Sequence, residues 1–228
     1  MNFKVPVITI DGPAGVGKGT ICSLLSKKLQ WHYLNSGVIY RVLAFLALHH
    51  KISVTDKTTL ESIAMNLDIH LKIKNGELKI IFEERNISNM IYMEPVGELA
   101  SKLALLPNVR QALLYKLRTC RLLPGLIAEG RDMGTVVFPD ASVKFFLDAS
   151  IEKRSLRRML QLQKKGFNVK FKQLLYELKT RDYRDSNRTI APLKPAKNAI
   201  IIDSTNLNIE QVFEKVLNYV FLQIEVPK

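Results

Sequence analysis

The sequence predicts an α/β fold in which a parallel β-sheet is flanked by helices, with a small α+β insertion. Short apolar runs of strand length alternate with longer segments of helical spacing, which is the pattern of a parallel sheet covered on both faces. A glycine-rich stretch directly follows the first apolar run. Between residues 55 and 105, alternating apolar and polar residues flank an Asn-Gly pair, which is the strongest short-range signal for an antiparallel hairpin.

The elements of the predicted core follow in chain order. Strands are expected where short apolar runs occur, at residues 5–10, 126–129, 143–148 and 199–203. Helices are expected where apolar residues recur at helical spacing, at residues 20–29, 36–49, 151–163, 171–184 and 209–223. The insertion is expected to contain hairpin strands at residues 68–74 and 78–82.

Length and composition favour one α/β domain with an insertion, because 228 residues, 47% of them hydrophobic, can bury a sizeable core. No apolar run approaches the ~18–20 residues that span a membrane, and no signal-peptide pattern is present. The cysteines, Cys22 and Cys120, and the four histidines lack metal-ligand spacing. We therefore expect a cytoplasmic protein with reduced thiols, no membrane partner and no zinc site.

The charge is strongly basic and unevenly distributed. The net charge is +13, and residues 151–190 contain twelve Lys or Arg against four Asp or Glu, a local net charge of +8. Such a segment suits nucleic acid, acidic lipid or phosphorylated small molecules. A nucleic-acid binder would need a recognisable module or aromatic residues interleaved with the basic ones. Since neither is evident, we expect phosphorylated small molecules and no nucleic acid.

The glycine-rich stretch DGPAGVGKGT fits the phosphate-loop pattern G-x-x-x-x-G-K from Gly12 to Lys18. Its backbone N–H groups and the following helix N-terminus would surround a phosphate, and Lys18 would reach the β- and γ-phosphates. The alternative, a tight turn with an incidental lysine, is disfavoured by the strand–loop–helix context. The residues expected to bind ATP are Gly12, Pro13, Ala14, Gly15, Val16, Gly17, Lys18, Gly19 and Thr20.

Three further stretches could bind an acceptor for the phosphoryl group. The sequence NSGVIYR at residues 35–41 begins a predicted helix, and EGRDMGT at 129–135 follows a strand at its carboxyl end, where open sheets bind ligands. The third, RDYRDSNR at 181–188, spaces Arg181, Arg184 and Arg188 three and four residues apart, on one face if the helix persists. Taken alone, this last stretch is more typical of a salt-bridged surface helix.

Together these stretches, with EGRDMGTVVFPDA at 129–141 and RRMLQLQ at 157–163, closely resemble the bacterial cytidylate kinases over nearly the whole chain. The GKGT form of the phosphate loop is also similar to that of other nucleoside monophosphate kinases. The resemblance implies a P-loop kinase core at residues 1–35 and 106–228. It also implies an α+β nucleoside-monophosphate-binding region at residues 36–105 and a short helical lid at about 151–168. We expect a monomer.

The resemblance further implies direct in-line transfer of the γ-phosphoryl group of MgATP to CMP or dCMP, without a strong general base. It assigns the CMP phosphate to Arg41 and Arg131. The remaining CMP-binding residues that it implies are Ser36, Gly37, Tyr40, Ser101, Arg110, Asp132, Arg181, Asp185 and Arg188. Whether Asp185 orients a neighbouring arginine or contacts the sugar is left open. A kinase acting on UMP, AMP or shikimate is the nearest alternative.

The expected catalytic residues are Lys18, Arg131, Arg157 and Arg158, the last two moving from the lid onto the ATP phosphates. Arg154, in the same segment, is equally consistent with a surface helix. The expected cofactor is Mg²⁺, with ATP as co-substrate. Because Gly19 stands where the phosphate-loop pattern usually has Ser or Thr, we expect no direct protein ligand to Mg²⁺ and name Thr20 and Glu129 as candidates acting through water.

Two positions depart from the family's pattern. Asn35 and Glu129 each stand where the family usually has Asp. Asparagine keeps hydrogen-bonding reach but loses the charge, so a contact with CMP or an arginine would be weaker there. Glutamate keeps the charge one methylene further out, which would shift a metal-bound water slightly. Pairing with Lys18 or an arginine is the alternative role for Glu129.

Overall fold

The computed structural model describes residues 4–67, 70–74, 77–82, 84–164, 166 and 168–224. The chain forms two compact units, one made of Met1–Leu34 with Cys120–Lys228 and the other of Asn35–Thr119. Helix α6 (Pro107–Thr119) packs on α3 (Lys57–Met65). The inserted unit therefore continues to Thr119, beyond residue 105, where the sequence-based region ends.

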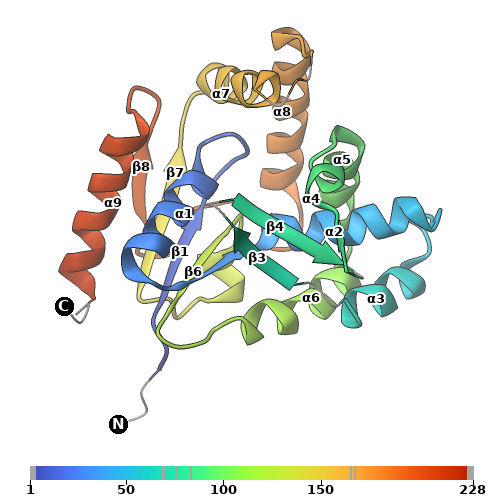
Figure 1. Ribbon diagram of the computed structural model, residues 1–228, viewed down its shortest axis with the longest axis horizontal. Helices are drawn as coiled ribbons and strands as arrows, with labels where there is room; N and C mark the ends of the chain where they lie inside the picture. The colour runs from blue at the N-terminus through green and yellow to red at the C-terminus, as the bar shows by residue number, and fades with distance from the viewer. Residues whose placement is uncertain are drawn as a thin grey trace. The chain divides into compact units, whose positions relative to one another are not determined.

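A five-stranded sheet forms the centre of the first unit (Figure 1). Its strands, in spatial order, are β2 (His32–Asn35), β6 (Leu126–Gly130), β1 (Val7–Asp11), β7 (Val143–Asp148) and β8 (Ile200–Asp203). Strand β1 pairs in parallel with β6 and β7, and β7 pairs in parallel with β8. The predicted α/β fold is confirmed. The register sets Asp11 opposite Gly130, so β1 and β6 end at the same edge of the sheet.

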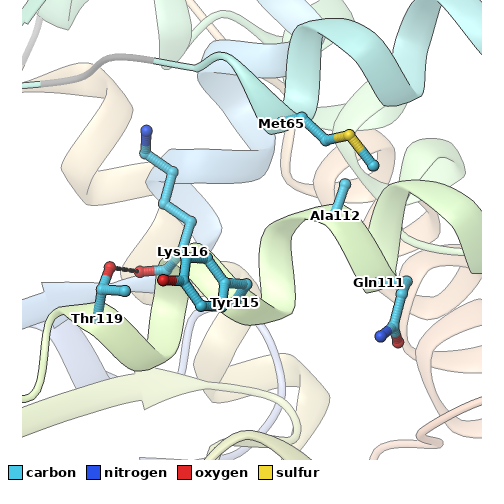
Figure 2. A pocket seen from close by; sticks show the side chains of 6 residues that line it. All are labelled: Met65, Gln111, Ala112, Tyr115, Lys116 and Thr119. Carbon is cyan, nitrogen blue, oxygen red and sulfur yellow. Dashed lines mark hydrogen bonds between the residues drawn. The ribbon is translucent and has the colours of Figure 1, made fainter.

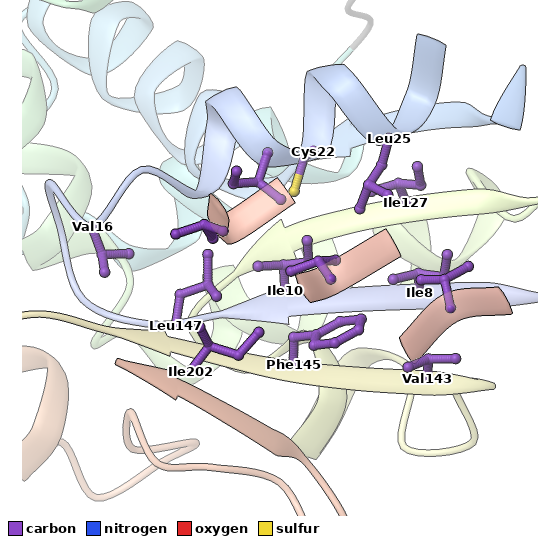
Figure 3. Close-up of a cluster of buried hydrophobic side chains, with 14 of the residues drawn as sticks. Ile8, Ile10, Val16, Cys22, Leu25, Ile127, Val143, Phe145, Leu147 and Ile202 are labelled. Carbon is purple, nitrogen blue, oxygen red and sulfur yellow. The ribbon is translucent and has the colours of Figure 1, made fainter. Parts of the chain in front are cut away.

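The helices of the first unit are α1 (Lys18–Leu29), α7 (Ile151–Gln163), α8 (Phe171–Asn187) and α9 (Ile209–Gln223). Side chains of α1 and α9 meet those of the strands in one apolar cluster, to which α9 contributes Val216. Figure 3 shows Leu25, Ile10 and Phe145 in this cluster. Each such aliphatic or aromatic side chain contributes roughly 1.5–3 kcal/mol when fully buried. This core fixes the strand ends from which the site is built.

The second unit contains the predicted antiparallel hairpin. Strands β3 (His70–Lys74) and β4 (Glu77–Phe82) pair with Leu71 opposite Ile80, and the short β5 (Arg85–Asn86) pairs with β4. The Asn75-Gly76 turn and the expected strand start at residue 68 lie outside the described residues. The helices of this unit are α2 (Ser36–His49), α3, α4 (Ser88–Ile91), α5 (Glu94–Leu103) and α6.

Two expectations about helix bounds need correction. Helix α1 begins at Lys18 rather than Thr20, directly after Gly17 in a left-handed conformation. Helix α8 runs on to Asn187, but Arg188 leaves it with φ −67° and ψ 140°. The expected shared helical face of Arg181, Arg184 and Arg188 is therefore wrong for Arg188. Among the described residues, no helix is both long and apolar enough to cross a membrane.

Candidate active site

The glycine-rich loop joins β1 to α1 in a conformation that needs its glycines. Gly12, Gly15 and Gly17 have φ values of 146°, 78° and 101°. A Cβ at Gly12 would lie 2.0 Å from the carbonyl oxygen of Leu147 in β7. Because this contact is with backbone, no side chain fits there, and the chain can turn sharply only with glycine.

Lys18, the first residue of α1, folds back over this loop. Its Nζ donates hydrogen bonds to the carbonyl oxygens of Gly12 at 2.8 Å and Pro13 at 2.7 Å. The side chain is buried. Burial, assisted by the positive charge of Arg131, lowers the pKa of Lys18 to about 7. Burial and Arg131 thus disfavour the charged form of Lys18, and the negative charge of a phosphate would favour it.

Glu129 is the buried carboxylate near the end of β6. Burial raises its pKa, while the charge of Lys18 and a hydrogen bond with the Tyr33 side chain act in the opposite direction. A Cβ at Gly19 would lie 3.4 Å from Glu129 Oε2 and 3.6 Å from the Tyr33 hydroxyl. The glutamate side chain, one methylene longer than aspartate, thus reaches the first turn of α1 beside Tyr33. The sequence analysis did not anticipate this contact.

Asp11, the last residue of β1, is a further site residue that the sequence analysis missed. Its Oδ1 accepts a hydrogen bond from the Met133 N–H at 2.9 Å, and its Oδ2 accepts one from Gly134 at 2.8 Å. These amides begin a π-helical turn, η1 (Met133–Val137), directly after Arg131 and Asp132. Burial raises the pKa of Asp11 to about 6. A carboxylate at a strand end, beside the glycine loop, was the signal available in the sequence.

The structure brings the EGRD segment and the end of α8 together through two charge pairs. Arg131 Nε lies 2.9 Å from Asp185 Oδ2, and Arg188 Nη2 lies 3.6 Å from Asp132 Oδ1. Asp132, Asp185 and Arg188 are buried. Burial favours the neutral form of Asp185, but the charges of Arg131 and Arg181 outweigh it and lower its pKa. Asp185 and Arg188 of residues 181–188 are thus buried, whereas Tyr183, Ser186 and Asn187 are exposed, so the surface-helix interpretation holds for only part of this stretch.

In the second unit, Arg41 of α2 has a fixed and buried guanidinium. Its Nη1 donates to the carbonyl oxygen of Ile91 at 2.7 Å, and its Cζ lies 5.8 Å from the centre of the Tyr92 ring. A Cβ at Gly97 of α5 would lie 2.6 Å from Nη2. Four residues along α5, the buried Ser101 Oγ makes no hydrogen bond to a described residue. Arg41 and Ser101 are thus two polar groups that α2 and α5 hold inside this unit.

The other expected acceptor residues of this unit lie on α2 and α6. Ser36, Gly37 and Tyr40 belong to the first turns of α2, where Ser36 is buried, and Arg110 Nη1 donates to the Ala104 carbonyl oxygen at 3.3 Å. Asn35 is the N-cap of α2, since its Oδ1 accepts from the Val38 N–H at 3.1 Å. Asparagine and aspartate are equally good N-caps, so this local role survives the departure from the family pattern.

The three arginines of α7 differ in their surroundings. Arg157 Nη2 donates to the carbonyl oxygen of Ser204 at 2.6 Å, and its Nη1 lies 3.4 Å from the Val16 carbonyl oxygen in the glycine-rich loop. Arg158 Nη1 donates to Gln161 Oε1 at 3.0 Å. Arg154 is buried, so the surface-helix reading of Arg154 is wrong. The position of Arg157 beside the loop is compatible with a role near ATP phosphates.

The part of the chain that the structure describes contains no cluster of three His, Cys, Asp or Glu residues able to hold a metal ion. Glu129 is a buried carboxylate whose charge lies near Lys18, and Thr20 is exposed on the first turn of α1. These oxygen atoms suit a hard divalent cation that keeps most of its waters. They do not form a dedicated protein cage.

A separate cavity of about 520 Å³ lies in the second unit, along one side of α6. Figure 2 shows its lining: Met65, Gln111, Ala112, Tyr115, Lys116 and Thr119. None of these is an expected site residue. The cavity is therefore distinct from the phosphate loop and from the arginine cluster.

Comparisons with known proteins agree over most of the chain. The family model described as Cytidylate kinase matches residues 8–221. Proteins named cytidylate kinase are similar to this chain: that of Erwinia tasmaniensis is 56% identical over 219 residues, covering 96% of both chains. The Shigella sonnei protein is 57% identical with the same coverage. The Yersinia enterocolitica protein is 54% identical over 227 residues, covering 100% of this chain and 99% of its own.

Proposed function

Because the chain belongs to the cytidylate kinase family, we propose that it transfers the γ-phosphoryl group of ATP to CMP or dCMP, giving ADP and CDP or dCDP. One arrangement carries this proposal. The phosphate loop with Lys18 leaves the end of β1, and Arg131 leaves the end of the neighbouring β6. Adjacent carboxyl ends of a parallel sheet thus present a phosphate cradle and an arginine to one region.

Residues Gly12 to Thr20 are proposed to bind ATP. The loop amides and the N-terminus of α1 would surround the phosphates. Lys18 donates to two loop carbonyl oxygens, and it would exchange these for the β- and γ-phosphate oxygens. The exchange replaces neutral carbonyl acceptors with negatively charged phosphate oxygens, which attract the ammonium group more strongly.

Arg41 and Arg131 are proposed to bind the CMP phosphate. The sugar and base would be bound by the remaining expected residues: Ser36, Gly37, Tyr40, Ser101, Arg110, Asp132, Arg181, Asp185 and Arg188. Buried groups that hydrogen-bond cytosine would be left without partners by another base, which penalises UMP. Region 36–105 is proposed as the nucleoside-monophosphate-binding region and about 151–168 as the lid.

The chemistry is proposed to be direct in-line transfer. An acceptor phosphate with a second pKa near ~6 is largely dianionic at neutral pH, so its oxygen can attack the γ-phosphorus without a general base. The chain would contribute orientation and positive charge through Lys18, Arg131, Arg157 and Arg158. The Asp185 carboxylate supports this by fixing Arg131.

Mg²⁺ is proposed to enter with ATP. When bound, it supplies charge neutralisation at the phosphate oxygens. Glu129 and Thr20 would hold its waters, because Glu129 is a buried carboxylate near Lys18 and Thr20 offers a hydroxyl in the first turn of α1.

The enzyme is proposed to act as a cytoplasmic monomer without nucleic acid or membrane. Part of the basic segment is used within the chain: Arg154 and Arg157 donate to loop carbonyl oxygens, and Arg188 lies near Asp132. In this structure these three cations therefore make contacts inside the chain rather than forming an exposed basic face. Light scattering with chromatography, and titration with an unrelated oligonucleotide at two salt concentrations, test both statements.

A coupled ADP-release assay with CMP, dCMP, UMP, AMP and shikimate tests the proposed function. We expect CMP and dCMP to be phosphorylated far faster than the other acceptors. UMP or AMP matching CMP would overturn the acceptor assignment, and absence of turnover with every acceptor would overturn the kinase assignment.

A further inference from the structure

We propose that Arg154 is a positioning residue that couples the ATP-binding loop to α8, so that occupation of the ATP site strengthens binding of the acceptor nucleotide. The inference rests on the proposed function, because it concerns the two nucleotides of that reaction. It adds a residue that the sequence analysis assigned to neither substrate. All the contacts involved lie within the first unit.

The guanidinium of Arg154 joins three segments. Its Nε donates to the Ala149 carbonyl oxygen at 2.9 Å, just before α7. Its Nη1 donates to the Ala14 carbonyl oxygen of the phosphate loop at 3.1 Å and lies 2.6 Å from Asp182 Oδ2 on α8. Only 5% of Arg154 is exposed, so water competes little for these contacts.

The backbone of α7 also touches the loop. A Cβ at Gly15 would lie 3.0 Å from the Arg154 carbonyl oxygen and 3.2 Å from its Cβ. The loop therefore rests on the first turns of α7 without intervening side chain. Because such close-packed contacts transmit displacement, a movement of the loop backbone at Ala14 and Gly15 also moves Arg154.

The other end of the connection is α8, which packs against α7 (Figure 1). Asp182 and Asp185 are three residues apart and so lie on neighbouring positions of the helix surface. Asp182 contacts Arg154, whereas Asp185 contacts Arg131. One rigid helix is thus attached both to the ATP loop and to an arginine proposed to bind the CMP phosphate.

The contact between Arg154 and Asp182 is directional. Asp182 Oδ1 is buried and makes no hydrogen bond to a described residue, so Oδ2 alone carries the contact. A planar guanidinium can donate hydrogen bonds to the Ala149 and Ala14 carbonyl oxygens and to this carboxylate at the same time. A lysine ammonium is a compact charge on a flexible side chain. Lysine at position 154 would keep the charge and lose the simultaneous contacts.

Phosphate binding would draw the loop amides toward the ligand, and the Ala14 carbonyl oxygen would move with them. Through Arg154 and Asp182, this movement would set the position of α8, and with it Asp185 and Arg131. Coupling of this kind is reciprocal, so CMP would strengthen ATP binding by the same factor.

Calorimetric titration measures the coupling factor directly. CMP is titrated into the full chain with and without a saturating non-hydrolysable ATP analogue and Mg²⁺, and the ratio of the two dissociation constants is the factor. For the wild type we expect a coupling factor of about fivefold or more, which is at the lower end of typical allosteric couplings. In Arg154→Lys and in Asp182→Asn we expect the factor to fall below about twofold, while each nucleotide alone still binds.

Lys179→Met is the matched control, since Lys179 is an exposed cation on α8, and it should keep the wild-type factor. Asp182→Asn leaves the two backbone contacts of Arg154 in place, so it decides the question if Arg154→Lys fails to fold. Wild-type coupling in both variants, or a wild-type factor near one with both nucleotides bound, overturns the inference. A wild type that binds neither nucleotide overturns the proposed function itself.

Discussion

Arg131 and Asp185 form an ion pair that joins the carboxyl end of β6 to α8, with Arg131 Nε 2.9 Å from Asp185 Oδ2. The side chains are 17% and 7% exposed, so the pair is largely shielded from water. Arg131 is therefore fixed before any nucleotide binds. Fixing a charged group in advance avoids the cost of ordering it during binding and reaction.

Replacing Asp185 by Asn is expected to lower kcat/KM for CMP by about 30-fold or more. The amide can still occupy the space, but it leaves the charges of Arg131 and Arg181 uncompensated, and such losses at buried pairs cost about 2–5 kcal/mol. Steady-state kinetics with CMP as the varied substrate measures the effect. Glu177→Gln is the control, because Glu177 lies on the same helix and accepts a hydrogen bond from the neighbouring Gln173 Nε2 at 2.8 Å. Equal effects in both variants would contradict the role assigned to Asp185.

Nucleotide binding is expected to take up protons through Lys18. With a pKa of about 7 in the free protein, this amine is largely neutral at pH 8, and phosphate oxygens would raise its pKa and protonate it. Calorimetry of ADP binding at pH 8, in buffers of different ionisation enthalpy, measures the uptake.

Lys18→Met removes the titrating group and serves as the control for that experiment. Proton uptake should vanish in this variant, and turnover should fall by about 10²-fold or more, as for other lost transition-state donors. The same uptake in Lys18→Met would assign the proton to another group. Thermal melting checks that the fold survives.

Asp11→Asn is expected to weaken the turn after Arg131 and Asp132. The amide can accept from only one of the Met133 and Gly134 N–H groups, and an unsatisfied buried N–H costs about 1–3 kcal/mol. We expect KM for CMP to rise about tenfold, with a smaller effect on KM for ATP. Equal effects on both KM values would contradict a role specific to this loop.

The same variant should change the pH dependence of stability. Because the pKa of Asp11 is raised to about 6 in the folded protein, the folded state binds more protons than the unfolded state between about pH 4 and 6. The wild-type free energy of unfolding therefore decreases as pH rises through that interval. Urea unfolding at several pH values should show the wild type losing stability relative to Asp11→Asn. A constant difference would contradict the assignment.

Gly97→Ala is expected to separate stability from acceptor binding. Alanine favours a helix interior by about 0.5–1 kcal/mol over glycine, but its Cβ would lie 2.6 Å from Arg41 Nη2. The guanidinium would have to move away from the Ile91 carbonyl oxygen. We expect KM for CMP to rise about tenfold while the free energy of unfolding changes by less than about 1 kcal/mol. An unchanged KM would show that the position of Arg41 is not critical.

Local patterns predicted much of the fold. The buried strands, the hairpin and helices such as α2, α7 and α9 follow from apolar periodicity and turn residues, which act over a few positions. The short β2 and β5 and the helices α3 to α6 were not individually predicted. Helix α5 does carry apolar residues at helical spacing, at Val96, Ala100 and Leu103, whereas the bounds of the shorter elements depend on packing. The end of α8 at Asn187 was missed for the same reason: Arg188 turns away from the helix, and its side chain lies near Asp132.

The sequence by itself determined the glycine-rich loop, since three glycines and one lysine within seven residues form the G-x-x-x-x-G-K pattern. It also indicated the arginine-rich acceptor segments through their resemblance to a family. Only the tertiary structure decided which charged groups turn inward. Arg154 with Asp182, Arg131 with Asp185, and Asp11 with the amides after Asp132 are pairs from distant segments. The packing of strands and helices decides which of these groups meet. Burial then strengthens the interaction within each pair, and a local sequence pattern does not show this.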